Sequence, residues 1–143
     1  MLKRAAQLVV AALITTIGVF VVASPASASV GGCTASTVIA ACVNYGDDGD
    51  LVRADFYENR VPDSDQVYYR VAIHFLTTGG SDDGAWVSPL TPIGGTGHYC
   101  CWYIPARHSL PQGNHGIKTV VYTFTANHTT HSVFTSPIKW YWG

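Results

Sequence analysis

Charged side chains are scarce in this chain, and glutamate is almost absent. Only 12% of the 143 residues are charged, and Glu58 is the one glutamate among the 9 acidic residues. A glycosidase usually sets two carboxylates across the bond it cleaves, and no aspartate spacing around Glu58 suggests such a pair. The formal net charge is −1, which gives no reason to expect a nucleic-acid partner.

Outside the N-terminus, the chain also lacks a helical period and any apolar run long enough to cross a bilayer. Its start combines Lys3 and Arg4 with the apolar run Ala5–Val22, followed by the small-residue site Ala26-Ser27-Ala28. This order is typical of a secretory signal peptide. We expect a signal peptide over residues 1–28, a single domain over residues 29–143, and a secreted, extracellular protein that leaves the membrane after cleavage.

Alternation of apolar and polar residues is the dominant pattern of the remaining chain. In Asp65–Thr77, every second residue from Val67 to Phe75 is apolar, which predicts a long central strand with one face in a core. Six other segments have a strand-like composition: Thr37–Tyr45, Leu51–Glu58, Ala85–Thr91, His98–Ile104, Ile117–Asn127 and Ser132–Trp142. About seven short antiparallel strands separated by turns predict an all-β sandwich.

The last third of the chain resembles a known family. Leu110-Pro111-Gln112-Gly113 precedes the alternating segment Ile117–Asn127, and Ser136-Pro137 precedes the closing residues. This succession resembles the final hairpin of bacterial immunoglobulin-like domains, and the short exported chain is similar in style to secreted actinobacterial proteins. The resemblance implies an immunoglobulin-like sandwich and no particular activity, because that fold has many unrelated functions.

Residue parity assigns side chains to the core or to the surface of the predicted sheets. We expect the core to include Val120, Tyr122, Phe124 and Ala126, together with Phe134, Ile138, Trp140 and Trp142. The opposite parity predicts a surface on the central sheet made by Tyr68, Arg70, His74, Lys139 and Tyr141. Exposed rings beside charged donors favour stacking of sugars or other flat ligands.

Four cysteines form an even set in an exported chain, so two disulfides are expected. Of the three possible pairings, we favour the two that link Cys33 and Cys42 each to one member of the adjacent pair Cys100 and Cys101, because a bond between neighbouring cysteines is uncommon. The alternative in which Cys33 carries a lipid anchor would leave an odd number of cysteines.

Two sets of residues are weaker candidates for metal ligands. His98, His108, His115, His128 and His131 fall in predicted turns or loops, and imidazole binds zinc and copper well. No carboxylate lies in that half of the chain to complete such a site. Asp47, Asp48, Asp50, Asp82 and Asp83 could bind calcium, but Asp and Gly are also common in hairpin turns. We therefore expect no metal and no cofactor.

No nucleophile motif surrounds a serine, so an enzyme is not favoured. We expect a secreted, non-enzymatic domain that binds an extracellular protein or a polysaccharide. One alternative is a protease inhibitor that presents the loop at residues 106–116. The other is a metal-dependent hydrolase built on the loop histidines.

Overall fold

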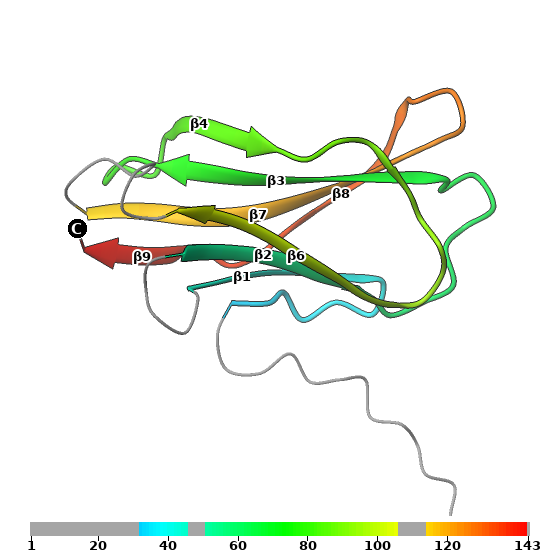
Figure 1. Cartoon of the computed structure of the whole chain (residues 1–143), viewed down its shortest axis with the longest axis horizontal. Helices are drawn as coiled ribbons and strands as arrows, with labels where there is room; N and C mark the ends of the chain where they lie inside the picture. Colours follow the sequence, from blue (N-terminus) through cyan, green and yellow to red (C-terminus); the bar gives the residue numbers. More distant parts are fainter. Residues whose placement is uncertain (1–31, 46–50, 106–113, 143) are drawn as a thin grey trace, which may run out of the picture.

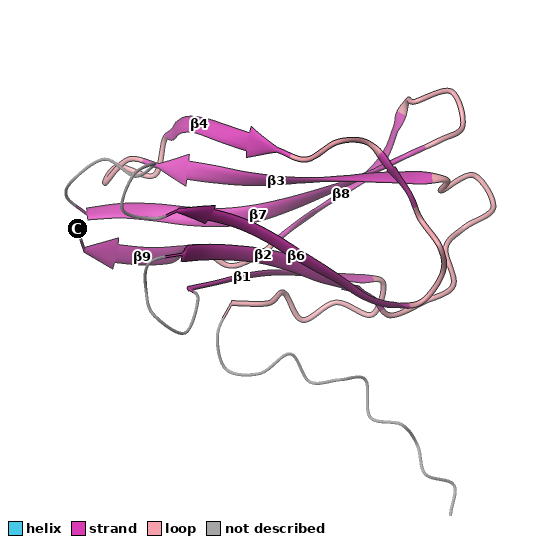
Figure 2. Ribbon diagram, in the orientation of Figure 1, coloured by secondary structure: helices cyan, strands magenta, loops and turns pink. Residues whose placement is uncertain are grey.

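The computed structural model describes residues 32–45, 51–105 and 114–142, and its regular secondary structure in these ranges consists of strands (Figures 1 and 2). Three predictions lie wholly or mostly outside them: the signal peptide, the acidic turn at residues 46–50, and the loop at residues 106–116. The last three residues of that predicted loop, 114–116, belong to a strand. The nine strands are β1 (Ile39–Tyr45), β2 (Leu51–Glu58), β3 (Tyr68–Leu76), β4 (Asp82–Val87), β5 (Thr91–Pro92), β6 (Gly97–Pro105), β7 (Asn114–Phe124), β8 (Thr130–Thr135) and β9 (Lys139–Trp142). The described part of the chain contains no helix that could span a membrane.

The strands form two antiparallel sheets. The smaller sheet has the order β1-β2-β6, and the larger has the order β4-β3-β7-β8, with β5 added beside β3 and β9 beside β7. Strands β3 and β7 pair without a register break from Tyr68 opposite Phe124 to Leu76 opposite Gly116, and they run side by side in Figure 1. The predicted central strand is therefore confirmed.

One hydrophobic core joins the two sheets. Val52, Ala54 and Phe56 of β2 are fully buried, as the alternation predicts, and they share one core cluster with Val71 and Ile73 of β3. The centre of this core is aromatic. The ring of Phe56 is stacked on that of Tyr99, with centroids 4.6 Å apart, and meets the ring of Tyr69 edge-on at 5.1 Å. These two ring geometries are the favourable ones for aromatic pairs.

The predicted core face of β7 is wrong for its aromatic residues. Thr119, Val121 and Thr123 are fully buried, whereas Tyr122 and Phe124 lie on the opposite face and are half-buried. Val120 shares that opposite face but is buried, as predicted. The reason is the register with β3, because residues directly opposite each other in antiparallel strands point to the same side. Core residues of β3 pair with the odd-numbered residues of β7. The side of β7 that faces the core therefore carries threonines, and the aromatic residues that the sequence pattern assigned to the core lie on the other side.

A Ser-Pro pair divides each edge strand of the larger sheet in two. Ser88-Pro89 separates β4 from β5, and Ser136-Pro137 separates β8 from β9, so nine strands are present where seven were predicted. Ser88 accepts a hydrogen bond from the backbone N–H of Val71 and donates its own N–H back to the Val71 carbonyl. Ser136 makes the same two bonds with Thr119. The register changes by one residue past each serine, and a one-residue change turns later side chains to the other face.

This correspondence extends over most of the domain. Ser136 follows Ser88 by 136 − 88 = 48 positions. Ala54 and Ala72 are paired in the sheets with Trp102 and Val120, and each of these partners also lies 48 positions later in the chain. The same offset carries β4 onto β8 and relates β2, β3 and β5 to β6, β7 and β9. Strands β2–β5 and β6–β9 therefore repeat one order and one pairing pattern.

The structure corrects the predicted disulfide pairing. Cys33 is bonded to Cys42, and Cys100 to Cys101. The predicted cross-link would join β1 to β6, but β2 lies between them. Two strand spacings amount to about 9.5 Å, whereas a disulfide spans Cα atoms up to roughly 7 Å apart. Cys33 instead lies directly opposite Cys42 in an antiparallel bridge.

Candidate functional site

The outward side of the larger sheet, called the outer face below, brings together three of the predicted site residues. Tyr68, Arg70 and His74 have the parity of β3 that points away from the core. In the register they lie opposite Phe124, Tyr122 and Lys118 of β7. The outer face therefore carries a double row of aromatic and basic side chains, of which parity reasoning found only the β3 half.

Lys139 does not belong to this face, which is a second correction. It pairs with Ile117, a fully buried core residue, so it points to the inner side of the sheet, and its side chain lies against Gly32. The cause is the register change at Ser136. The backbone of Tyr141 pairs with that of His115, but the side chain of Tyr141 lies outside the described part of the structure.

Trp140 takes the place that was predicted for Lys139. It pairs with Gly116, and a Cβ atom on Gly116 would meet both the Trp140 ring and Ile138. Trp140 is 44% exposed and Ile138 is 43% exposed, so neither is the core residue that the sequence predicted. The one-residue register change at Ser136 explains why both Trp140 and Ile138 were wrongly predicted to be core residues.

Exposed apolar side chains gather on the outer face. Val87 lies opposite Ala72, and Val133 lies opposite Tyr122, so both point outward together with Ile138 and Trp140. These make four of the six large apolar side chains that are exposed among the described residues, the other two being Val61 and Tyr103. Isolated exposed apolar residues are ordinary, whereas several on one sheet face are less usual for a protein surface.

Polar contacts on the outer face centre on Asp82. Its Oδ1 lies 3.4 Å from Nδ1 of His74 and 3.5 Å from Nζ of Lys118. Asp82 is exposed, so these ion pairs add little stability, but they fix the positions of the two basic side chains. Among the described residues, Arg70 has no carboxylate partner. Its guanidinium lies 5.9 Å from the centroid of the Phe124 ring, a cation–π arrangement.

The candidate histidines and aspartates named from the sequence do not form one common cluster among the described residues. His131 contacts Asp65, and the ring of His128 meets that of Tyr68 edge-on. Asp82 is engaged by basic side chains. The residues at 47, 48, 50 and 108 and the side chain of His115 lie outside the described part of the structure.

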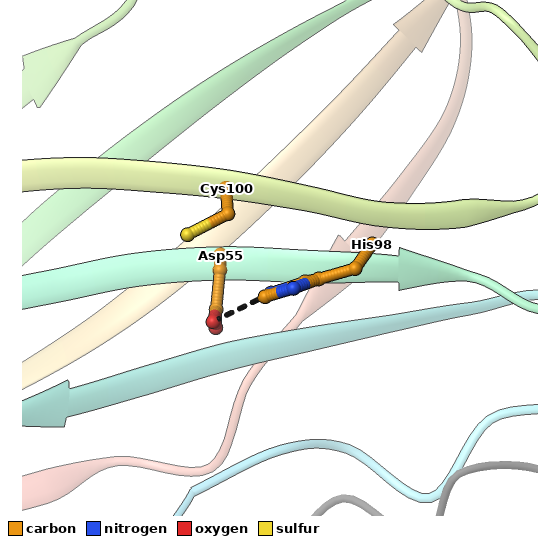
Figure 3. Close-up of side chains that lie close together, drawn as sticks. All are labelled: Asp55, His98 and Cys100. Atoms are coloured by element: carbon orange, nitrogen blue, oxygen red, sulfur yellow. Dashed lines mark hydrogen bonds and ion pairs between the residues drawn. The ribbon is translucent and has the colours of Figure 1, made fainter.

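A different cluster occupies the outward side of the smaller sheet. Asp55 of β2 is 2% exposed, and Nε2 of His98 on β6 donates a hydrogen bond of 2.9 Å to its Oδ2 (Figure 3). Cys100 lies beside them, and one ligand atom from each residue falls within 4.8 Å of the others. Although no carboxylate follows His98 in the sequence, pairing of β2 with β6 brings the earlier Asp55 to it, so a carboxylate does join one of the late histidines.

Sequence reasoning missed this cluster because its members are 43 residues apart in the chain. The sequence pattern of β2 contained part of the information, because its alternation places Asp55 on the outward side together with Arg53 and Tyr57. Comparisons of the chain with protein-family models, with curated protein sequences and with solved structures gave no match.

Proposed function

We propose that this protein is a secreted, non-enzymatic binding domain with an immunoglobulin-like fold, and that it binds polysaccharide through the outer face. The observation that carries the proposal is the concentration of exposed apolar side chains on that face, beside fixed basic groups. The ligand would lie across the β3–β7 pair, with Tyr122, Phe124 and Arg70 at its centre.

Strand order supports the immunoglobulin-like assignment. In such domains the first, second and fifth strands share a sheet, and the third strand pairs with the sixth, which is followed by the seventh. If β4 and β5 together form the edge strand that some of these domains add, the order β1-β2-β6 and β4-β3-β7-β8 fits this scheme. The inter-sheet disulfide of antibody domains has no counterpart, since both cystines belong to the smaller sheet.

The chemistry of the face favours a polysaccharide over a protein surface. The apolar faces of sugar rings stack on aromatic side chains, and the hydroxyl groups of sugars accept hydrogen bonds from basic donors. Tyr122 and Phe124 lie side by side, with centroids 6.5 Å apart and planes tilted by 33°, and Arg70 lies against Phe124. A rigid sheet holds these groups with little conformational entropy left to lose on binding.

Depletion of the purified protein by insoluble chitin and by cellulose tests the proposal. Tyr122→Ala and Arg70→Ala are each expected to weaken binding about tenfold, which corresponds to about 1.4 kcal/mol. Tyr103→Ala is the matched control, because Tyr103 is 51% exposed and lies on the smaller sheet. Equal weakening by Tyr103→Ala would contradict the assigned face. Binding to neither polysaccharide, with capture of a protein from culture supernatant through the same residues, would favour the protein-binding alternative.

A further inference from the structure

The cluster around Asp55 combines features that a simple surface ion pair lacks. Oδ1 of Asp55 is buried and has no hydrogen-bond partner. On the neighbouring strand the register changes, so that Cys100 and Cys101 together stand opposite Asp55. Such a bulge redirects side chains and is common beside functional sites. The result is a buried carboxylate, an imidazole and a sulfur atom on one outward surface.

The donor set fits zinc. Zinc binds carboxylate oxygen, imidazole nitrogen and thiolate sulfur in a tetrahedral arrangement, and its ligand atoms lie about 3.5 Å apart at the usual bond lengths. The three candidate atoms lie within 4.8 Å of one another, so small side-chain rotations would bring them to this spacing. The ring of Tyr57 is stacked on that of His98, with centroids 4.3 Å apart, and orients the imidazole.

The sulfur of Cys100 is not available while it is bonded to Cys101, because zinc requires a thiolate. We propose that reduction of the Cys100–Cys101 disulfide creates a zinc site, with Cys100, His98 and Asp55 as ligands and a fourth position open to water. A dithiol reductant supplies the two electrons and two protons, becoming a disulfide as the two protein thiols form. Zinc then replaces the thiol proton of Cys100, and one proton is released.

Exposure makes this reduction selective. Cys100 is exposed, whereas in the other disulfide Cys33 is half-buried and Cys42 is fully buried. A reductant must reach a sulfur atom to exchange with it. Mild reduction is therefore expected to open the Cys100–Cys101 bond first and to leave the Cys33–Cys42 bond closed. Alkylation followed by peptide mass measurement gives the order in which the two bonds open.

Cobalt(II) binding tests the site, because a cobalt–thiolate bond adds a charge-transfer absorption that oxygen and nitrogen ligands do not produce. The oxidised protein should show no such band. The mildly reduced protein should show it, and zinc should abolish it by competition. Cys101→Ser frees the Cys100 thiol permanently, so this variant should show the band without any reductant, whereas Cys100→Ser should not show it under either condition.

His98→Gln identifies the imidazole ligand. Loss of an outer partner of a metal site commonly weakens metal affinity about 10–100-fold, so loss of a ligand should weaken cobalt binding at least that much. His131→Gln is the matched control, since His131 also faces an aspartate, Asp65, at 3.4 Å. Both histidines are at the surface, and circular dichroism checks that the variants fold.

Two outcomes would overturn the proposal. One is a Cys101→Ser protein that folds but binds cobalt no more tightly than the oxidised wild type. The other is a His98→Gln protein that retains the full affinity of the reduced wild type. Both readouts concern the smaller sheet, so they are independent of polysaccharide binding by the outer face.

Discussion

Glu58→Gln is expected to stabilise the protein above pH 7 and to leave its stability nearly unchanged near pH 4.5. Glu58 is 2% exposed, and its Oε1 has no hydrogen-bond partner. Nε2 of Gln66 donates to Oε2 at 3.3 Å. Burial raises the pKa of Glu58 from 4.5 to about 7, while Gln66 and Arg60 oppose this rise and Asp63 adds slightly to it.

The sign of the effect follows from proton binding. Between pH 4.5 and about 7, the folded protein holds a proton on Glu58 that the unfolded chain has released. The free energy of unfolding therefore falls as the pH rises through this range and is constant above it. One pH unit of difference in pKa corresponds to about 1.4 kcal/mol. After allowance for solvent screening near the exposed Arg60–Asp63 pair, we expect a total loss of about 1–3 kcal/mol.

Urea denaturation of the wild type and of Glu58→Gln, at half-unit steps from pH 4.5 to 8, measures this loss. The difference in unfolding free energy should grow from near zero to about 1–3 kcal/mol in favour of the variant. Asp63→Asn serves as the control, because Asp63 is exposed and should not reproduce the trend. Parallel profiles for the wild type and Glu58→Gln would refute the assigned burial of a protonated carboxyl.

Three further predictions concern packing and cross-links. Phe56→Ala should lower the unfolding free energy by about 3–5 kcal/mol in urea denaturation, and Trp140→Ala by less than half as much, since Trp140 is 44% exposed; the reverse order would contradict the register after Ser136. Ser136→Ala should cost about 1–3 kcal/mol in the same assay, because it leaves the buried N–H of Thr119 without an acceptor; no loss would show that another group satisfies it. A non-reducing digest should yield a peptide containing the Cys33–Cys42 bond, and a peptide joining either cysteine to β6 would contradict the described pairing.

The strands themselves were largely predictable because alternation is local information. β2 matches its predicted bounds, and β3 lies within its predicted segment. The alternation of residues predicted the wrong buried face where the local hydrophobic pattern disagrees with the pairing register of the strand. On β7, buried threonines and outward aromatic residues invert the usual preference, and only the pairing with β3 reveals which face is buried. A one-residue change at Ser136 reverses parity without any hydrophobic signal.

The candidate sites depended on pairing between distant segments, which single-strand patterns do not contain. Tyr68, Arg70 and His74 were found because they share one strand, whereas Lys118 and Tyr122 join them only through the β3–β7 register. The repeated strand arrangement was equally hidden. Its clearest trace in the sequence is Ser-Pro at 88–89 and again at 136–137, a signal too short to recognise before the hydrogen bonds around each serine are known.

The binding role of the outer face is tested most directly by nuclear magnetic resonance titration of the isotope-labelled protein with soluble chitin and cellulose oligosaccharides. Amide shift changes are expected to concentrate on β3 and β7, around Arg70 and Tyr122, and Arg70→Ala is expected to remove them. Shift changes confined to the smaller sheet, around Tyr57 and Tyr103, would contradict the claim that the outer face is the binding surface.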